Sequence, residues 1–268
     1  MPDATVSLTR QTITVGGDQR SFLLAEPQGP VAGVVLSLHG TRSGADRQAR
    51  LSGMARLASG AGGAVVAFPQ AVMPIGSGYE WDHDGDLPFL SQLAEQLIGR
   101  YQPPAGRVCM TGMSGGARMS CYFAASRADL TAGVGAVAGL RASGQHPPTR
   151  AVPILAFHGT ADRINPYAGG STPRWDESVA DSARRWAKAN HLAPEPEVVA
   201  VSSTLTRTTY GREGEPGEVT LWISSGAGHT WPGSHVGLFL RLFLGRTSQE
   251  LDATEKIWAF GQQHAGDP

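Results

Sequence analysis

One pentapeptide in this sequence has the residue types and spacing of an activated serine nucleophile, Gly112-Met-Ser-Gly-Gly116. It follows the apolar run Arg107–Thr111 and opens a stretch of helical composition, Gly115–Arg127. A serine hydroxyl is a weak nucleophile, so it must project toward a base and a substrate at once, and a sharp strand-to-helix turn projects it. The first and last glycines of the pentapeptide keep two crossing backbones free of side-chain clashes. This context favours Ser114 as a nucleophile over an incidental serine in a glycine-rich turn.

A serine presented in this way works with an acid and a histidine that follow it in the order Ser, Asp or Glu, His. Asp162 comes shortly after the apolar run Val152–Phe157, at the end of an expected strand. Asp176 and Asp181 lie in a helical pattern, where a solvated face is the expected environment. We therefore expect Asp162 to be the acid, with a plain turn residue as the alternative.

Four histidines follow Asp162 in the chain, and one of them is placed as a general base should be. His229 follows the apolar run Val219–Ile223 through a short loop of serine, glycine and alanine, which would let the ring reach the serine. His191 is expected at a helix end and His264 in a polar tail. His235 follows a turn with no strand directly before it. The sequence favours His229.

The negative oxygen that forms during acyl transfer needs backbone N–H donors. We expect these to be the N–H of Gly115, at the start of the helix, and the N–H of Thr41, in the loop after an early strand. His39 and His158 each precede a glycine at a strand end. We interpret both as structural residues that bond to nearby backbone, because buried polar groups normally find partners.

Three aromatic residues are candidates for binding a substrate: Trp231, two residues after His229, and Tyr79 and Trp81, which precede a helix at the same end of the sheet. We expect Trp231 to be an exposed side chain at the rim of the cleft.

The acidic segment 82–86 resembles a calcium loop at first sight. Counted from Asp82, however, the sixth place is Leu87 instead of glycine, and the twelfth is Leu93 instead of a bidentate acid. The segment is interpreted as a loop and a helix cap at Asp86, with no metal site. No cofactor is expected either.

Continuous apolar runs, which are typical of strands buried on both faces, alternate with helical stretches from residue 31 onward. This alternation predicts an α/β fold in a single domain, 1–268, with a mostly parallel central sheet, helices on both faces and an N-terminal antiparallel hairpin. The expected strands are Thr5–Thr14, Arg20–Ala25, Val31–Leu38, Ala64–Phe68, Arg107–Thr111, Gly133–Ala138, Val152–Phe157 and Val219–Ile223. The expected helices are Arg47–Ser59, Leu87–Tyr101, Gly115–Arg127, Trp175–Asn190 and Gln249–Gln262.

Composition excludes several classes of protein. Of 268 residues, 41% are hydrophobic and 17% charged, which is typical of a folded chain and not of a disordered one. A net charge of −1 gives no long-range attraction to nucleic acid or to an anionic membrane. We find no apolar window of membrane-spanning length, and the N-terminus is not a signal peptide, or one has been removed. Two cysteines cannot form a disulfide framework.

Four segments together resemble the esterase/poly(3-hydroxybutyrate) depolymerase family of α/β-hydrolases, which includes feruloyl and acetylxylan esterases. The resemblance extends from about residue 20 to the C-terminus. It implies Ser114 as nucleophile, His229 as general base and Asp162 as its orienting acid, in agreement with the assignment from order and context. The segments are Leu38-His-Gly40, Gly112-Met-Ser-Gly-Gly116, His158-Gly-Thr-Ala-Asp162 with Asn165-Pro-Tyr-Ala-Gly-Gly170, and Gly228-His-Thr-Trp-Pro-Gly233.

The expected function is therefore serine carboxylic-ester hydrolysis through an acyl-enzyme, on polyhydroxyalkanoate-type or plant-cell-wall (feruloyl or acetyl) esters. A peptidase or thioesterase with the same triad, and a non-catalytic binding protein of this fold, are the alternatives. The link Gly139–Ala151 is too short for a cap domain, so we expect an open site that suits a bulky or polymer-bound ester.

The resemblance also bears on location. Many secreted relatives carry disulfides, whereas Cys109 and Cys121 are interpreted here as small core residues. The resemblance suggests an extracellular protein, but the missing signal and disulfide pattern leave a cytoplasmic one open. The sequence does not decide the oligomeric state.

Overall fold

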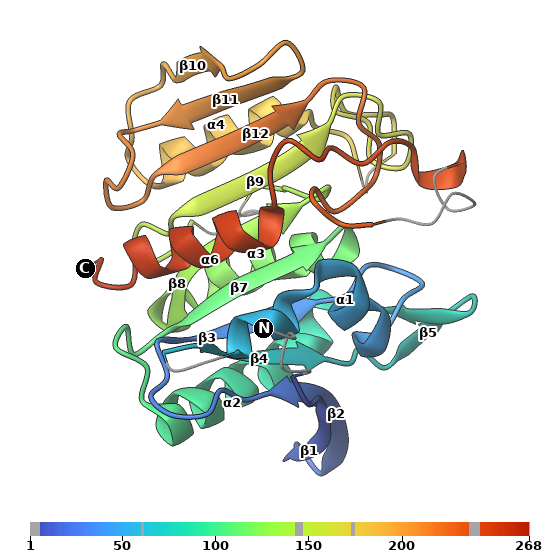
Figure 1. The fold of residues 1–268 in the computed structure, drawn as a ribbon, viewed down its shortest axis with the longest axis vertical. Coiled ribbons are helices and arrows are strands. Elements are labelled where there is room, and N and C mark those ends of the chain that lie inside the picture. Colours follow the sequence, from blue (N-terminus) through green and yellow to red (C-terminus); the bar gives the residue numbers. More distant parts are fainter. Residues whose placement is uncertain (1–5, 60–61, 143–146, 173–174, 236–241, 268) are drawn as a thin grey trace.

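The computed structural model describes residues 6–59, 62–142, 147–172, 175–235 and 242–267. A ten-stranded sheet has the strand order β1-β2-β4-β3-β7-β8-β9-β12-β11-β10 (Figure 1). Its six central strands, β4 to β12 in that order, are parallel. The pairs β1–β2 and β10–β11 extend it with antiparallel strands.

The structure gives the following bounds for the strands and helices. The strands are β1 (Thr9–Val15), β2 (Asp18–Ala25), β3 (Gly33–Leu38), β4 (Ala64–Pro69), β5 (Met73–Ile75), β6 (Gly78–Glu80), β7 (Val108–Met113), β8 (Thr131–Val137), β9 (Ile154–Gly159), β10 (Glu197–Ala200), β11 (Leu205–Tyr210) and β12 (Val219–Ser224). The helices are α1 (Ala45–Ser52), α2 (His83–Tyr101), α3 (Gly115–Ser126), α4 (Val179–Ala189) and α6 (Ala253–Gln263), with 3-10 helices η1 (Met54–Ala58) and η2 (Ala128–Leu130).

Helices cover both faces of the sheet, with α1 and α6 in front of it in Figure 1. Residues of α2, α3 and α4 share one apolar cluster with Val34 and Leu36 of β3. Residues of α1, η1 and α6 share a second cluster with Val35, because successive strand residues point to opposite faces. Every residue of β4, β7, β8 and β9 is buried. The predicted mostly parallel sheet, its two helical layers and the N-terminal hairpin are confirmed.

Several predicted boundaries differ from the structure. The expected helix Arg47–Ser59 is split, because Gly53 adopts a left-handed conformation (φ 61°) that ends α1 before η1 begins. α4 begins at Val179, where the side chain of Ser178 caps it, and not at Trp175. Thr5, the expected start of the first strand, lies outside the described residues. The sequence reading missed β10, a four-residue edge strand with no buried position, and β11, in which polar residues interrupt the apolar ones.

Asp86 is not the cap of α2, which begins four residues earlier than predicted, after Asp82. Asp86 lies in the first turn and accepts the backbone N–H of Asp82 (3.0 Å). Its other oxygen pairs with Arg20 of β2 at 2.5 Å, with both side chains buried. The Arg20 guanidinium also lies over the ring of Phe89. Asp86 therefore joins the N-terminal hairpin to α2, which a cap residue would not do.

The link between β8 and β9 spans residues 138–153, and its described part forms neither helix nor strand. Within the described ranges, no helix combines the length and apolar character needed to cross a membrane. Cys109 and Cys121 are buried free thiols. Burial raises their pKa values to about 12 and about 11, so both behave as small core residues, as predicted.

The ends of β3 and β7 approach each other so closely that only glycine fits between them. A Cβ atom on Gly116 would lie 2.1 Å from the carbonyl oxygen of Leu38. One on Gly112 would lie 2.6 Å from the carbonyl carbon of Gly116 and 2.7 Å from the same Leu38 oxygen. The sequence reading did not single out a third glycine of this kind, Gly139. A Cβ atom on Gly139 would lie 2.4 Å from the carbonyl oxygen of Ser114. Backbone packing, without side chains, therefore sets the position of the turn.

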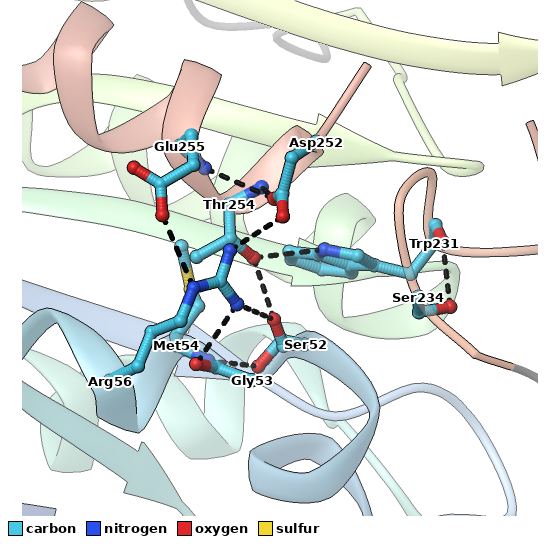
Figure 2. A network of polar contacts seen from close by, with 9 residues as sticks. All are labelled: Ser52, Gly53, Met54, Arg56, Trp231, Ser234, Asp252, Thr254 and Glu255. Carbon is cyan, nitrogen blue, oxygen red and sulfur yellow. Dashed lines mark hydrogen bonds and ion pairs between the residues drawn. The ribbon is translucent and has the colours of Figure 1, made fainter. Parts of the chain in front are cut away.

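Trp231 is buried, so the prediction of an exposed aromatic at the cleft rim is wrong. Its side chain is 1% exposed. The indole N–H donates to the hydroxyl of Thr254 (3.1 Å), which in turn donates to the carbonyl of Ser52 (2.6 Å) (Figure 2). The ring satisfies its one polar group inside the core and packs in the apolar layer of α1 and α6. Trp231 thus ties the loop that follows His229 to both helices.

Arg56 adds an outer set of contacts to this junction (Figure 2). Its guanidinium pairs with Asp252 (2.7 Å) and Glu255 (3.2 Å) and donates to the carbonyls of Ser52 and Gly53. These side chains are largely exposed, and exposed ion pairs contribute about 0–1 kcal/mol each. The buried indole is therefore the stronger connection between α1 and α6.

We expect Trp231→Ala to destabilise the fold by about 3–5 kcal/mol, because it leaves a cavity and removes the hydrogen bond to Thr254. Trp231→Phe keeps most of the ring and should cost about 1–2 kcal/mol. Urea unfolding of the purified variants measures both values. An unchanged unfolding midpoint for Trp231→Ala, with a raised KM, would restore the surface role first expected of this residue.

Gly116→Ala should destabilise the protein by about 3 kcal/mol or more, because its methyl group meets a backbone oxygen that cannot move without shifting β3. Gly99→Ala is the matched control. Gly99 lies inside α2, and a methyl group added there would have open space around it, with no atom within 4 Å. Alanine at this position should stabilise the helix by about 0.5–1 kcal/mol. Thermal unfolding of the two variants checks the contrast, and equal effects would contradict the close approach.

Candidate active site

Ser114 sits at the turn between β7 and α3 in a backbone conformation that non-glycine residues rarely adopt, with φ 55° and ψ −113°. Such a conformation costs of order 1–3 kcal/mol and persists only where the surroundings impose it. Its N–H donates to the carbonyl of Val137 (2.8 Å), and its carbonyl accepts the N–H of Arg118 (3.0 Å). The turn holds the serine at the end of β7, as the sequence predicts for a nucleophile.

His229 and Asp162 come from different strand ends and form a direct hydrogen bond. Nδ1 of His229 lies 2.7 Å from Oδ2 of Asp162, and both side chains are buried. The other carboxylate oxygen accepts the N–H groups of Ile164 (2.9 Å) and Asn165 (2.8 Å). Because a carboxylate only accepts, Nδ1 carries the proton in the neutral ring, and Nε2 is the nitrogen able to take one up.

Asp162 is ionised at neutral pH. Burial raises the pKa of its carboxyl group, but the hydrogen bond and charge of His229 and the N–H of Asn165 outweigh this, and the pKa lies below its usual value. His158 is also near, with Nε2 3.4 Å from Oδ2 of Asp162. Burial lowers the pKa of His158, and its Nε2 contacts the carbonyl of Asn165 (2.8 Å). His158 is therefore a neutral ring that faces Asp162 without neutralising its charge.

The loop after β3 runs beside the serine. A Cβ on Gly40 would lie 3.6 Å from Cβ of Ser114, and one on Gly115 would lie 3.0 Å from the backbone nitrogen of Thr41. The two N–H groups predicted as oxyanion donors thus lie next to Ser114. The Thr41 hydroxyl, 2.5 Å from the same Gly115 position, is a third polar group here that the sequence reading did not consider.

His39 holds this loop in place through hydrogen bonds to its backbone and to Ala71, in the structural role predicted for it. Its Nδ1 contacts the carbonyl of Gly40 (2.9 Å), and its Nε2 accepts the N–H of Ala71 (3.2 Å). Burial lowers the pKa of the ring below its usual value, against the opposing effect of the Gly40 carbonyl, so the ring is neutral at pH 7. His39 and His158 both bond to backbone, as expected.

Ser114 and His229 line one pocket of about 860 Å³. Apolar side chains from four regions of the chain form part of its wall, and three arginines form another. Besides Met113, which directly precedes Ser114, the apolar residues are Leu51, Ile75, Ile164, Trp175 and Leu244, and the arginines are Arg42, Arg47 and Arg50. Sequence reasoning missed all eight. Trp175 was expected to begin a helix, and neither the isolated apolar residues nor the arginines form a pattern.

The remaining aromatic candidates do not line this pocket. Trp81 is 5% exposed and donates its indole N–H to the carbonyl of His39 (2.8 Å), so its predicted place in the cleft is wrong; it supports the loop from inside. Tyr79 is 41% exposed on β6. Its backbone, not its ring, reaches the site by bonding Arg42 (3.0 Å) and Ser43 (3.1 Å).

The other late histidines lie elsewhere or lack an acid. His235 lines the pocket, but His229 is the one that Asp162 orients. His264, expected in a polar tail, is fully buried between Asp267 (2.8 Å) and Glu218 (3.5 Å). His191 follows α4 with φ 60°.

Searched over the described residues, His, Cys, Asp and Glu form no group of three or more suited to a metal. In the segment 82–86, which resembles a calcium loop at first sight, Asp82 directly precedes α2. Its carboxylate lies so close to Gly85 that a methyl group on this glycine would collide with it.

Comparison with known proteins supports the assignment of the fold. No family model matches the chain. It is 28% identical over 262 residues to a protein of Nocardia uniformis subsp. tsuyamanensis named "Putative esterase NocK", covering 87% of this chain and 76% of that one.

Two solved structures superimpose on most of the chain. An acetyl xylan esterase from Aspergillus awamori matches with a TM-score of 0.64 and 16% identity, over 95% of this chain and 99% of that one. An α/β serine hydrolase homologue from Coxiella burnetii matches with a TM-score of 0.50 and 15% identity, over 83% and 89%. The sheet order, the serine turn and these structural similarities show that the chain has the α/β-hydrolase fold, and its sequence is similar to that of a protein named as an esterase.

Proposed function

We propose that this protein hydrolyses carboxylic esters with Ser114 as nucleophile, His229 as general base and Asp162 as the acid that orients the base. The observation that carries the proposal is the 2.7 Å bond between His229 and Asp162, together with the pocket that His229 shares with Ser114, a serine held in a strained turn. The names of NocK and of the Aspergillus awamori structure support ester hydrolysis as the reaction.

In this mechanism His229 takes the proton of the Ser114 hydroxyl through Nε2 while the serine oxygen attacks the ester carbonyl. The negative oxygen that forms is stabilised by the N–H groups of Thr41 and Gly115. Protonated His229 then gives its proton to the departing alcohol, which leaves an acyl group on the serine. Water activated by the same imidazole releases the acid and restores the hydroxyl. Asp162 stabilises the imidazolium at both stages without itself taking a proton.

The substrates we propose are polyhydroxyalkanoate-type esters or the feruloyl and acetyl esters of plant cell walls. The size of the pocket and the short β8–β9 link support an ester bulkier than a small free one. A panel of p-nitrophenyl acetate, methyl ferulate, acetylated xylan and poly(3-hydroxybutyrate) ranks the ester classes. A peptide and a thioester added to the panel decide against the peptidase and thioesterase alternatives.

Ser114→Ala should remain folded and lose esterase activity by on the order of 10⁴-fold or more, because no other group forms the acyl-enzyme. A fluorophosphonate probe should label the wild type and not this variant. Ser126→Ala, at the exposed end of the same helix, is the control and should keep both activity and labelling. A loss of only a few-fold in Ser114→Ala would rule the nucleophile out.

Activity should fall as the pH is lowered, because a protonated imidazole cannot accept the serine proton. Since the pKa of Asp162 lies below its usual value, this carboxylate stays ionised through the weakly acidic range and the loss should follow one protonation. A kcat/KM profile from about pH 5 to 9 measures it. Asp162→Asn should cost on the order of 10³-fold, less than Ser114→Ala, because the amide no longer selects the required tautomer. A flat profile would contradict histidine as the base.

A further inference from the structure

Three arginines stand on one wall of the pocket that contains Ser114 and His229. Arg47 and Arg50 lie one turn apart on α1, and Arg42 lies in the loop between β3 and α1. All three are exposed and all three line the pocket. A hydrolase acting on neutral esters has no need for three positive charges beside the reacting serine.

Acidic side chains do not neutralise this wall. The residues that line the pocket, taken over the described ranges, include no aspartate or glutamate. The one acid of α1, Asp46, is engaged elsewhere, in an ion pair with Arg10 of β1 at 2.7 Å. Likewise, no ion pair between described residues includes any of the three arginines. Like charges gathered in a concave site raise the local positive potential, which concentrates anions there.

Arg42 is the arginine whose place is most closely defined. It follows Thr41 directly and has φ 61°, a left-handed conformation that costs a non-glycine residue free energy. Its backbone N–H is held by the carbonyl of Tyr79 (3.0 Å), and its side chain packs along Gly76 of the β5–β6 turn. The chain thus fixes a cation one residue beyond the backbone nitrogen proposed to bind the oxyanion.

We infer that the preferred substrates are esters that carry a free carboxylate, which the wall of Arg42, Arg47 and Arg50 binds. The inference rests on the proposed ester hydrolysis and names its substrate class. A guanidinium presents parallel N–H donors that match a carboxylate, while the apolar side chains of the pocket contact the hydrocarbon part. Half-esters of dicarboxylic acids and ester oligomers that end in a free acid have this chemistry.

Two pairs of esters that differ only in charge test the inference. For the acyl side, the pair is mono-4-nitrophenyl adipate and its methyl ester. For the alcohol side, it is 4-acetoxybenzoate and its methyl ester. Each rate is divided by the spontaneous hydrolysis rate of the same ester. We expect kcat/KM to favour the charged member by roughly tenfold in at least one pair at low salt. The preference should shrink as NaCl is added, because salt screens exposed charges.

The double variant Arg47→Gln/Arg50→Gln separates charge recognition from catalysis. It should lower kcat/KM for the favoured charged ester by roughly tenfold, mainly through KM, and leave its neutral partner within about twofold. Arg212→Gln makes the same kind of substitution once, at an exposed position outside the pocket, and is the control for loss of a surface arginine. It should change neither rate.

Equal rates for the charged and neutral members of both pairs overturn the carboxylate inference while leaving ester hydrolysis in place. An equal loss on both members in the double variant overturns it as well. If none of the four esters is hydrolysed and the fluorophosphonate probe does not label Ser114, the proposed function fails together with the inference.

Discussion

The candidate site depends on a contact between two stretches of backbone. The carbonyl oxygen of Leu38 occupies the space where a side chain of Gly116 would begin. This contact brings the end of β3 against the turn after β7, so that Thr41 lies beside Ser114 and the first residues of α3. A side chain at the crossing would separate the nucleophile from the N–H groups proposed to stabilise its oxyanion. The geometry is therefore set before any functional side chain is considered.

Holding the site in this arrangement costs free energy that the surrounding structure must offset. The backbone of Ser114 is strained, and the buried carboxylate of Asp162 has lost most of its hydration. The carboxylate recovers part of that cost through His229 and through the N–H groups of Ile164 and Asn165. Each of these bonds involves a charged acceptor and is stronger than a neutral one. The same bonds that stabilise the charge therefore also orient the imidazole.

Sequence reasoning predicted what depends on chain order and local pattern, and it failed where tertiary packing decides. The turn around Ser114, the parallel strands and the residues that precede Asp162 and His229 all leave local signals. Trp231 leaves a misleading one: it lies two residues from His229, yet its indole turns inward to meet Thr254, 23 positions later. Arg47 leaves no signal, because an exposed arginine on an amphipathic helix is ordinary until the fold places it against a distant serine.

The connection of Trp231 to α6 has a consequence for how the molecule is made. Thr254, which receives the indole N–H, belongs to a helix that is translated after every other element described here. The adjacent Ala253 donates its N–H to the carbonyl of Pro232, in the same loop as the histidine. A growing chain can form the sheet, the serine turn and Asp162 first. The loop with His229 is held in part by the backbone carbonyls of Leu244 and Arg246, but Trp231 and Pro232 gain their contacts only when α6 docks. The loop that carries the histidine would then reach its final position only after α6 has been translated and has docked.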